Sequence, residues 1–227
     1  MTGFFVTGTD TGVGKTLIAS ALLHAFAAAG QSTVGMKPVA AGCETGLGVP
    51  SWGDVDMLRA ASTVAAPLEL VSPYAFAPPV APHVAAAQAG VTIDLPRIRE
   101  ACERLRRLAD IVIVEGVGGF KVPLNDAQDT ADLAKLLELP VILVVGMRLG
   151  CINHALLAAQ AIGSAKLPLA GWVANRVDPG MAAFEENVRA LEARIAAPLL
   201  GVVGYRDAPD PLQVAGSIEA QRLLRWE

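Results

Sequence analysis

Short apolar runs alternate with longer amphipathic stretches along most of the chain. Runs rich in β-branched residues predict six strands, at residues 4–7, 33–37, 111–115, 141–145, 169–175 and 199–203. Helices are expected between them, at residues 15–29, 95–108, 130–138, 152–164 and 182–195. Strands that alternate with helices in this way predict a mainly parallel, doubly wound sheet in a three-layer α/β/α fold.

The residues between these elements support the same division of the chain. Asp94 and Asp129 each precede an expected helix and are suitable N-caps. A glycine-rich segment at 42–53 and a proline-rich segment at 67–82 fall between the second and third strands. Loops this long in a compact domain usually carry a function or form a lid. No linker or repeat is evident, so residues 1–227 are expected to form a single domain.

Composition and charge exclude several classes of protein. The chain is 53% hydrophobic and 18% charged, which is not the composition of a disordered chain. The net charge of −4 gives no basic surface for a nucleic acid, and no apolar run approaches the length of a membrane span. Three widely spaced cysteines indicate neither a disulfide framework nor a zinc site. We therefore expect a cytoplasmic protein without nucleic-acid or membrane partners.

The strongest chemical signal is a glycine-rich loop that runs from Gly8 to Thr16 (GTDTGVGKT), between the first strand and the first helix. Its backbone N–H groups and the helix N-terminus can bind phosphates. Lys15 can reach the outer phosphates, and the Thr16 hydroxyl can ligate Mg²⁺. Five residues rather than four separate Gly8 from Gly14, so the loop departs from the usual spacing. The pattern still predicts a P-loop NTPase-like fold.

Two strand ends carry further candidate residues. Glu115 ends the third strand before a glycine-rich turn, and Lys37 ends the second strand before Pro38. Ligands of doubly wound sheets bind at the carboxyl ends of strands, so Glu115 could complete a Mg²⁺ site and Lys37 could hold an anion. Lys37 could equally be a surface lysine. Asp54 could be a metal ligand or the N-cap of a short helix.

Another candidate is the segment GCINH, residues 150–154, which follows the fourth strand and opens a helix. Its N–H groups could bind a carboxylate, or Asn153 could simply cap the helix. Cys151 is not expected to be a nucleophile, because nothing in the sequence indicates a base positioned to activate it.

Taken together, these motifs resemble the dethiobiotin synthetase family. The resemblance rests on FVTGTDTGVGKT, KPVAAG, the Asp54 region, VEGVGG, PVILVVGMRLGCINHALL, LAGWVANRV and APLLG, which span nearly the whole chain in the family's order. Partitioning and septum-site ATPases are related, but they carry a signature lysine where this chain has Asp10. A partitioning-type ATPase and a small-molecule kinase remain the alternative functions.

The resemblance implies an ATP-dependent ring closure in biotin biosynthesis. Diaminopelargonate takes up CO₂ as a carbamate, ATP converts the carbamate into a carbamic-phosphoric anhydride, and the second amine closes the ureido ring. The products are dethiobiotin, ADP and phosphate, with Mg²⁺ as the cofactor. A homodimer with the substrate site at its interface is also implied.

The resemblance further assigns roles to individual residues. Catalysis would rest on Lys37 with Lys15 and Thr11, and the metal would be held by Thr16, Asp54 and Glu115. The substrate would be bound by Lys37, Ala41, Gly150, Cys151, Ile152 and Asn153. ATP would be bound by Gly12, Val13, Gly14, Lys15, Thr16, Leu17, Asp54, Glu115, Gly116, Val117, Gly118, Asn175, Arg176, Gly204, Tyr205 and Arg206. Ala41 replaces a hydroxyl residue, Asn187 stands where many members have a tyrosine, and Gly204–Arg206 lacks the family's usual proline.

Overall fold

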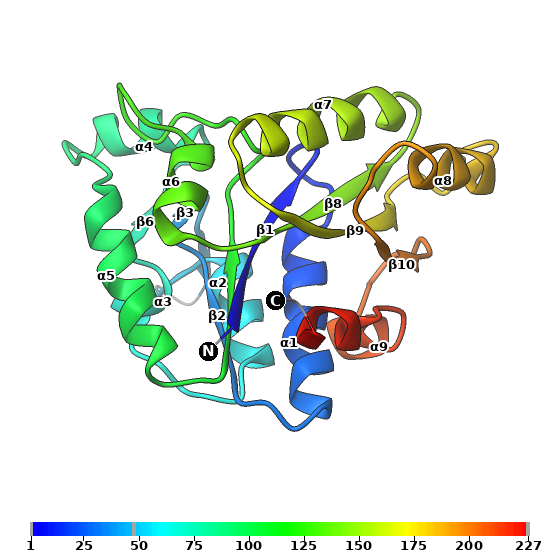
Figure 1. Ribbon diagram of the computed structural model, residues 1–227. Helices are drawn as coiled ribbons and strands as arrows, with labels where there is room; N and C mark the ends of the chain where they lie inside the picture. The colour runs from blue at the N-terminus through cyan, green and yellow to red at the C-terminus, as the bar shows by residue number, and fades with distance from the viewer. Residues whose placement is uncertain (1, 47–48, 226–227) are drawn as a thin grey trace.

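A six-stranded parallel sheet forms the centre of the molecule (Figure 1). The computed structural model describes residues 2–46 and 49–225. Its strand order is β10-β9-β8-β1-β7-β2, and each neighbouring pair is parallel. The strands are β1 (Thr2–Gly8), β2 (Thr33–Met36), β7 (Ile111–Glu115), β8 (Val141–Met147), β9 (Leu169–Arg176) and β10 (Leu199–Val203). These six strands confirm the sequence prediction.

Helices cover both faces of this sheet, which confirms the three-layer fold (Figure 1). One face carries α1 (Lys15–Ala28), α2 (Gly53–Ala61), α9 (Pro211–Ala215) and a 3₁₀ segment, η1 (Ala220–Arg225). The other face carries α3 (Leu68–Val71), α4 (Pro82–Gln88), α5 (Leu95–Arg106), α6 (Thr130–Leu137), α7 (Cys151–Ser164) and α8 (Phe184–Glu192). No helix within the described ranges is long and apolar enough to cross a membrane.

The side chains of β1 point alternately into two hydrophobic cores, one on each face of the sheet. Phe4 and Val6 are fully buried in the core under α1, while Phe5 is fully buried in the core on the opposite face. Successive side chains of a strand point to opposite faces, so one strand can serve both cores. Because β1 lies between β7 and β8, its carboxyl end opens at the middle of the sheet edge. The phosphate loop follows at that position.

Residues between β2 and α5 are more ordered than the sequence suggested. The parallel pair β3 (Val39–Ala41) and β6 (Tyr74–Phe76) and the antiparallel pair β4 (Glu44–Gly46) and β5 (Val49–Ser51) form two small sheets. Helices α2, α3 and α4 also lie in this stretch. The two expected loops are therefore largely short strands and helices, too brief to show a clear period in sequence.

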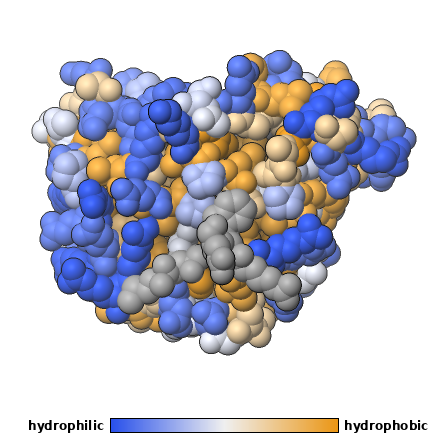
Figure 2. All heavy atoms as spheres, in the orientation of Figure 1, coloured by the Kyte–Doolittle hydropathy of each residue, from blue (hydrophilic) through white to orange (hydrophobic). Residues whose placement is uncertain are grey.

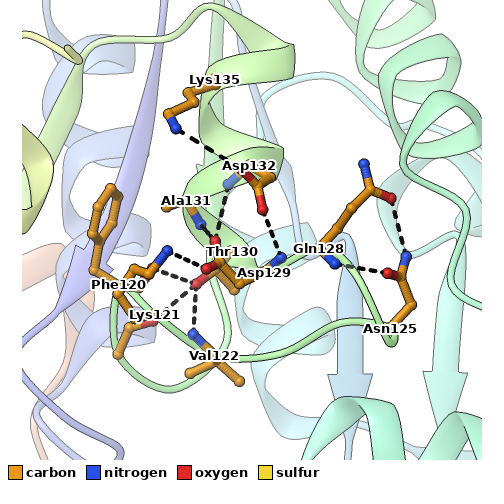
Figure 3. Close-up of polar contacts among 11 residues, drawn as sticks. Phe120, Lys121, Val122, Asn125, Gln128, Asp129, Thr130, Ala131, Asp132 and Lys135 are labelled. Atoms are coloured by element: carbon orange, nitrogen blue, oxygen red, sulfur yellow. Dashed lines mark hydrogen bonds and ion pairs between the residues drawn. The ribbon is translucent and has the colours of Figure 1, made fainter. Parts of the chain in front are cut away.

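A network of polar contacts fixes the turn that leads from β7 into α6 (Figure 3). Asp129 caps α6 by accepting hydrogen bonds from the amides of Ala131 and Asp132, and the Asp132 side chain accepts from the Asp129 amide. The Thr130 hydroxyl donates to the Phe120 carbonyl at 2.6 Å. The predicted cap at Asp129 is confirmed, as is the one at Asp94 on α5. The single-domain assignment stays a prediction.

Candidate active site

The phosphate loop has the strand–loop–helix setting that the sequence predicted. Gly12 and Gly14 adopt φ values of +71° and +88°, in the left-handed region that favours glycine. The Thr9 amide donates to the Val144 carbonyl of β8 at 3.0 Å, and the Asn175 amide nitrogen donates to the Val13 carbonyl at 2.9 Å. The loop is thus held from both β8 and β9.

Lys15, the first residue of α1, is only 7% exposed and faces a cleft of about 790 Å³. Its Nζ donates to the Asp10 carbonyl at 2.8 Å. Burial and the neighbouring charge of Lys37 lower the pKa of Lys15 to about 8, against the opposing attraction of Glu115, Asp10 and Asp54. The ammonium is therefore held in a position where an anion would stabilise its charged form.

Lys37 lies at the bottom of the same cleft, between two carboxylates. Its Nζ is 2.5 Å from Oε1 of Glu115 and 2.7 Å from Oδ2 of Asp54. The lysine is 3% exposed and the glutamate 1% exposed. Burial alone would lower the pKa of Lys37, but the two carboxylates outweigh it and raise the pKa. Lys37 is thus a buried cation, and its interpretation as a surface lysine is wrong.

Asp54 lies in the first turn of α2, one residue after the helix begins. The N-cap position is Trp52, which makes no side-chain cap, so Asp54 is not the N-cap. Burial opposes ionisation of Asp54, but attraction and a hydrogen bond from Lys37 hold its pKa below the usual range. Asp54 is therefore an anion aimed at the strand ends of β2 and β7.

The oxygen atoms around Lys37 fit a hard cation such as Mg²⁺. The Thr16 hydroxyl donates to Oε1 of Glu115 at 2.9 Å, and Asp54 completes a set of three oxygen-bearing side chains. Oε2 of Glu115 is buried and has no hydrogen-bond partner among the described residues. Within those residues no group of three or more His, Cys, Asp or Glu side chains could hold a metal, so the candidate set depends on the Thr16 hydroxyl as well as the two carboxylates. Two carboxylates and a hydroxyl suit Mg²⁺, which usually keeps several waters.

The cleft brings together about half of the residues that the resemblance assigned to the site. Those that line it are Thr11, Gly12, Gly14, Lys15, Thr16, Lys37, Ala41, Asp54, Glu115, Val117 and Gly118. Val13 is buried beneath the loop, Leu17 packs in the core of α1, and the Gly116 carbonyl accepts from Lys37 at 3.3 Å. Residues 79–82 and Val122 also line the cleft. Residues 79–82 were indicated in the sequence only as part of the proline-rich segment.

The residues assigned to the nucleotide base are not among those that line the cleft. Asn175 is 5% exposed and supports the phosphate loop through Val13. A Cβ at Gly14 would come within 2.2 Å of the Asn175 amide nitrogen, so the contact requires glycine there. Arg176 donates to carbonyls of the following loop, including Pro179 at 2.9 Å. Gly204, Tyr205 and Arg206 are exposed beyond β10.

The start of α7 also lies away from this cleft's lining. Gly150 is its N-cap with φ +93°, and no side chain caps the helix, so Asn153 is not a capping residue. Cys151 is 1% exposed, and burial raises the pKa of its thiol, which agrees with the expectation that it is not a nucleophile. Ile152 is half-buried and Asn153 is exposed.

Comparison with known proteins gives close relatives along nearly the whole chain. A family profile described as an AAA domain matches residues 2–212. The ATP-dependent dethiobiotin synthetase BioD of Nitrosospira multiformis is 58% identical over 221 residues, 97% of this chain and 96% of the relative. The proteins of the same name from Aromatoleum aromaticum and Ralstonia nicotianae are 59% and 51% identical, over 95% and 97% of this chain and 96% of each relative.

Solved structures share the fold at much lower identity. The MinC:MinD cell division protein complex of Aquifex aeolicus aligns with a TM-score of 0.62 at 15% identity, over 100% of this chain and 97% of that chain. MinD of the same organism aligns with a TM-score of 0.59 at 16% identity, over 100% and 98%. At this identity the likeness shows only the P-loop NTPase fold. The profile match and the 51–59% identity over nearly full length place the protein more narrowly: the chain belongs to the family of ATP-dependent dethiobiotin synthetases.

Proposed function

We propose that the chain closes a ureido ring on diaminopelargonate, using CO₂ and ATP, to give dethiobiotin, ADP and phosphate for biotin biosynthesis. The observation that carries this proposal is the pair of buried lysines, Lys15 and Lys37, which line one cleft with the phosphate loop. A reaction between two anions, a carbamate and the γ-phosphate of ATP, needs cations at the point where they meet. The family membership supports the same reaction.

The reaction balances in three steps. One amine of the substrate adds to CO₂ and loses a proton, which gives a carbamate. A carbamate oxygen then attacks the γ-phosphorus, and ADP leaves, which forms a carbamic-phosphoric anhydride. The second amine attacks the carbonyl carbon and loses a proton, the ring closes, and phosphate leaves. Free carbamate is a poor electrophile, so the phosphoryl group is needed as the leaving group.

The cleft residues divide this work between them. The phosphate loop and the N-terminus of α1 bind the ATP phosphates. Lys15 gives up its hydrogen bond to the Asp10 carbonyl and donates to the phosphoryl group that is transferred. Lys37 neutralises the carbamate, and Thr11 supplies a hydroxyl to the cleft, which Ala41 does not. Thr16, Asp54 and Glu115 would hold Mg²⁺, which would neutralise phosphate charge in the transfer. Residues 12–17 and 115–118 form the walls of the nucleotide site.

The base-binding roles of Asn175, Arg176, Gly204, Tyr205 and Arg206 belong to the same proposal. Nδ2 of Asn175 is engaged by Val13, so its Oδ1 is the atom that would accept a hydrogen bond from the base. Arg176 would have to give up carbonyl contacts to reach the base. Base binding therefore involves rearrangement of the loop that follows β9.

We also propose that the active species is a homodimer whose partner supplies the start of α7. Gly150–Asn153 lies outside the lining of its own cleft, so its N–H groups, except that of Cys151, which donates to the Arg148 carbonyl, are available to a substrate carboxylate in another subunit. Leu149 is 96% exposed and Leu157 56% exposed, and Figure 2 shows hydrophobic residues among hydrophilic ones along the α7 edge. A two-fold interface over this edge would cover both leucines.

Product analysis with labelled bicarbonate tests the proposed reaction. The enzyme is incubated with ATP, Mg²⁺, diaminopelargonate and ¹³C-bicarbonate, and we expect the label in the ring carbonyl, with one phosphate released per ring. A small-molecule kinase would phosphorylate a stable acceptor without bicarbonate. A partitioning-type ATPase would release phosphate without the diamine. Either result would contradict the proposal.

Subunit mixing tests the shared site. Lys15→Ala removes the phosphate contact of its own cleft, and Gly150→Val disturbs the start of α7. Each variant alone should be inactive, while a mixture should regain activity, because a mixed dimer has one intact site. Failure of the mixture, with both variants folded and dimeric, would show that each subunit uses its own α7.

A further inference from the structure

Asp10 and Arg148 join the phosphate loop to the turn before α7, two segments that are 138 positions apart in sequence. Nη2 of Arg148, in the turn between β8 and α7, lies 2.6 Å from Oδ2 of Asp10, in the phosphate loop. We infer that this pair is a positioning device for the reaction proposed above, on which the inference rests. It fixes the phosphate loop relative to the start of α7, which in the proposed dimer completes the partner's site. The phosphoryl donor of one site and the substrate-binding helix end of the other site therefore keep one geometry.

Asp10 organises its own end of the device through three separate atoms. Oδ1 accepts a hydrogen bond from the Thr11 amide at 2.7 Å, Oδ2 accepts from Arg148, and the backbone carbonyl accepts from Lys15 at 2.8 Å. Thr11 and Lys15 both line the cleft. The orientation of the Asp10 carboxylate therefore fixes the position of the loop segment that precedes the phosphate-binding glycines. Arg148 in turn fixes the orientation of that carboxylate.

Arg148 connects to α7 through its main chain. Its carbonyl accepts a hydrogen bond from the amide of Cys151, the first residue of α7, at 3.0 Å. The side chain of the same residue is the one that reaches Asp10. A shift of the phosphate loop is therefore transmitted through a single residue to the first turn of α7, where the N–H groups of Gly150–Asn153 are presented.

Other contacts between the phosphate loop and β8 involve residues within the strand and do not include α7. The Gly146 amide donates to the Thr9 hydroxyl at 3.2 Å, and a Cβ at Gly146 would come within 2.6 Å of Val13. These contacts hold the base of the loop against the strand. They leave the segment at Asp10 and Thr11 to be fixed by Arg148.

The exposure of the pair points to function rather than to folding. The side chains of Arg148 and Asp10 are 42% and 47% exposed, and exposed ion pairs contribute little to stability. Small displacements of reacting groups have large effects on rate: about 1 Å can cost roughly a hundredfold. Loss of the pair should therefore change turnover far more than melting temperature.

The first test compares Arg148→Met with Arg148→Lys, Asp10→Asn and the control Arg189→Met. Arg189 forms an exposed pair with Glu186 on α8, outside the cleft lining. The control therefore removes an ion pair of the same kind at a position away from the cleft. We expect Arg148→Met to lower kcat about tenfold or more and to leave KM for ATP within about twofold, since the glycines and Lys15 still bind phosphate. Its melting temperature should fall by less than about 4 °C.

The conservative and double variants decide whether the pair acts as a unit. Arg148→Lys should recover most of kcat, and Asp10→Asn should resemble Arg148→Met. The double variant should be no slower than the slower single variant. If Arg148→Met behaves like Arg189→Met, if lysine gives no recovery, or if the two losses multiply, the inference is wrong.

A second test does not depend on turnover. Amide hydrogen exchange is measured with and without Mg-ADP, and we expect the nucleotide to slow exchange in both the phosphate loop and residues 150–154 of the parent. In Arg148→Met only the loop should be protected. Equal protection of residues 150–154 in parent and variant would overturn the inference. A parent that makes no dethiobiotin would refute the proposed function alone, since the exchange result still decides the role of the pair.

Discussion

Replacement of Lys37 by Met would remove the only cation that lies between Asp54 and Glu115 in the described part of the chain. The change keeps an unbranched side chain that is one atom shorter, but it leaves two carboxylates facing each other, one of them 1% exposed. We expect two consequences: the folded protein loses stability, and the site gains affinity for a divalent cation. The second expectation follows because the lysine ammonium and the metal compete for the same oxygen atoms.

The structure gives the size of both effects. Breaking a buried ion pair costs about 3–5 kcal/mol, and solvent around Asp54, whose side chain is 42% exposed, puts this case near the lower limit, about 3 kcal/mol. For a chain of this length that corresponds to a fall of about 6–12 °C in melting temperature. Removal of a unit charge within hydrogen-bond distance of the ligand oxygens should tighten Mn²⁺ binding at least tenfold, about 1.4 kcal/mol.

The assay needs no substrate. Melting curves of parent and variant are recorded with and without Mn²⁺, and free Mn²⁺ is titrated by electron paramagnetic resonance. The matched control is Lys121→Met, which removes a 61% exposed lysine from Asp129 outside the cleft lining and should alter neither quantity appreciably. Weaker Mn²⁺ binding in Lys37→Met would refute the competition, and an unchanged melting temperature would refute the burial argument.

Three further predictions concern α6 and the cysteines. Asp129→Ala should cost about 1 kcal/mol through loss of the α6 cap, whereas Asp129→Asn should keep most of it; equal melting temperatures for the two would contradict the capping role. Partial burial would raise the pKa of Asp129, but hydrogen bonds from Lys121 and the α6 amides hold that pKa below its usual 3.8. The stability that Asp129 adds is therefore complete above pH 3.8 and is lost as the pH falls through the lower pKa of the folded state. Burial raises the pKa of the Cys102 thiol to about 11, so iodoacetamide at pH 8 should label the half-buried Cys43 first, as peptide mass spectrometry can check; faster labelling of Cys102 would contradict its burial.

The parts of the site that follow directly from a strand end were predictable from sequence. The phosphate loop depends on neighbours within a few residues, and Glu115 and Lys37 follow from the rule that ligands bind at the carboxyl ends of parallel strands. Glu115 and Lys37 both line the cleft as that rule requires. Local pattern and general topology were sufficient here.

Contacts that depend on the path of the chain between elements were not predictable. Asp54 reaches Lys37 only because β3, β4 and β5 return the chain to the strand ends before α2 begins, so sequence left its role open. Arg176 lies in a family motif, but its guanidinium is held by carbonyls of the next loop. The Asp10–Arg148 pair joins two segments whose separation in sequence conceals their contact. In each case tertiary packing decided the partner.

The position of β1 and α1 has a consequence for how the protein is made. β1 is paired on one side with β7 and on the other with β8, and α1 is covered by α9 and η1. All of these partners are synthesised later than β1 and α1, and the last of them near residue 225. On the ribosome, β1 therefore has no strand partner until β7 and β8 emerge, and the apolar surface of α1 that contacts α9 and η1 stays exposed until residues 211–225 emerge. Contacts of such long sequence separation slow folding and leave aggregation-prone surface exposed. The nascent chain should thus bind general chaperones through residues 2–28, and nucleotide should protect it from proteolysis only once residues 211–225 have packed against α1.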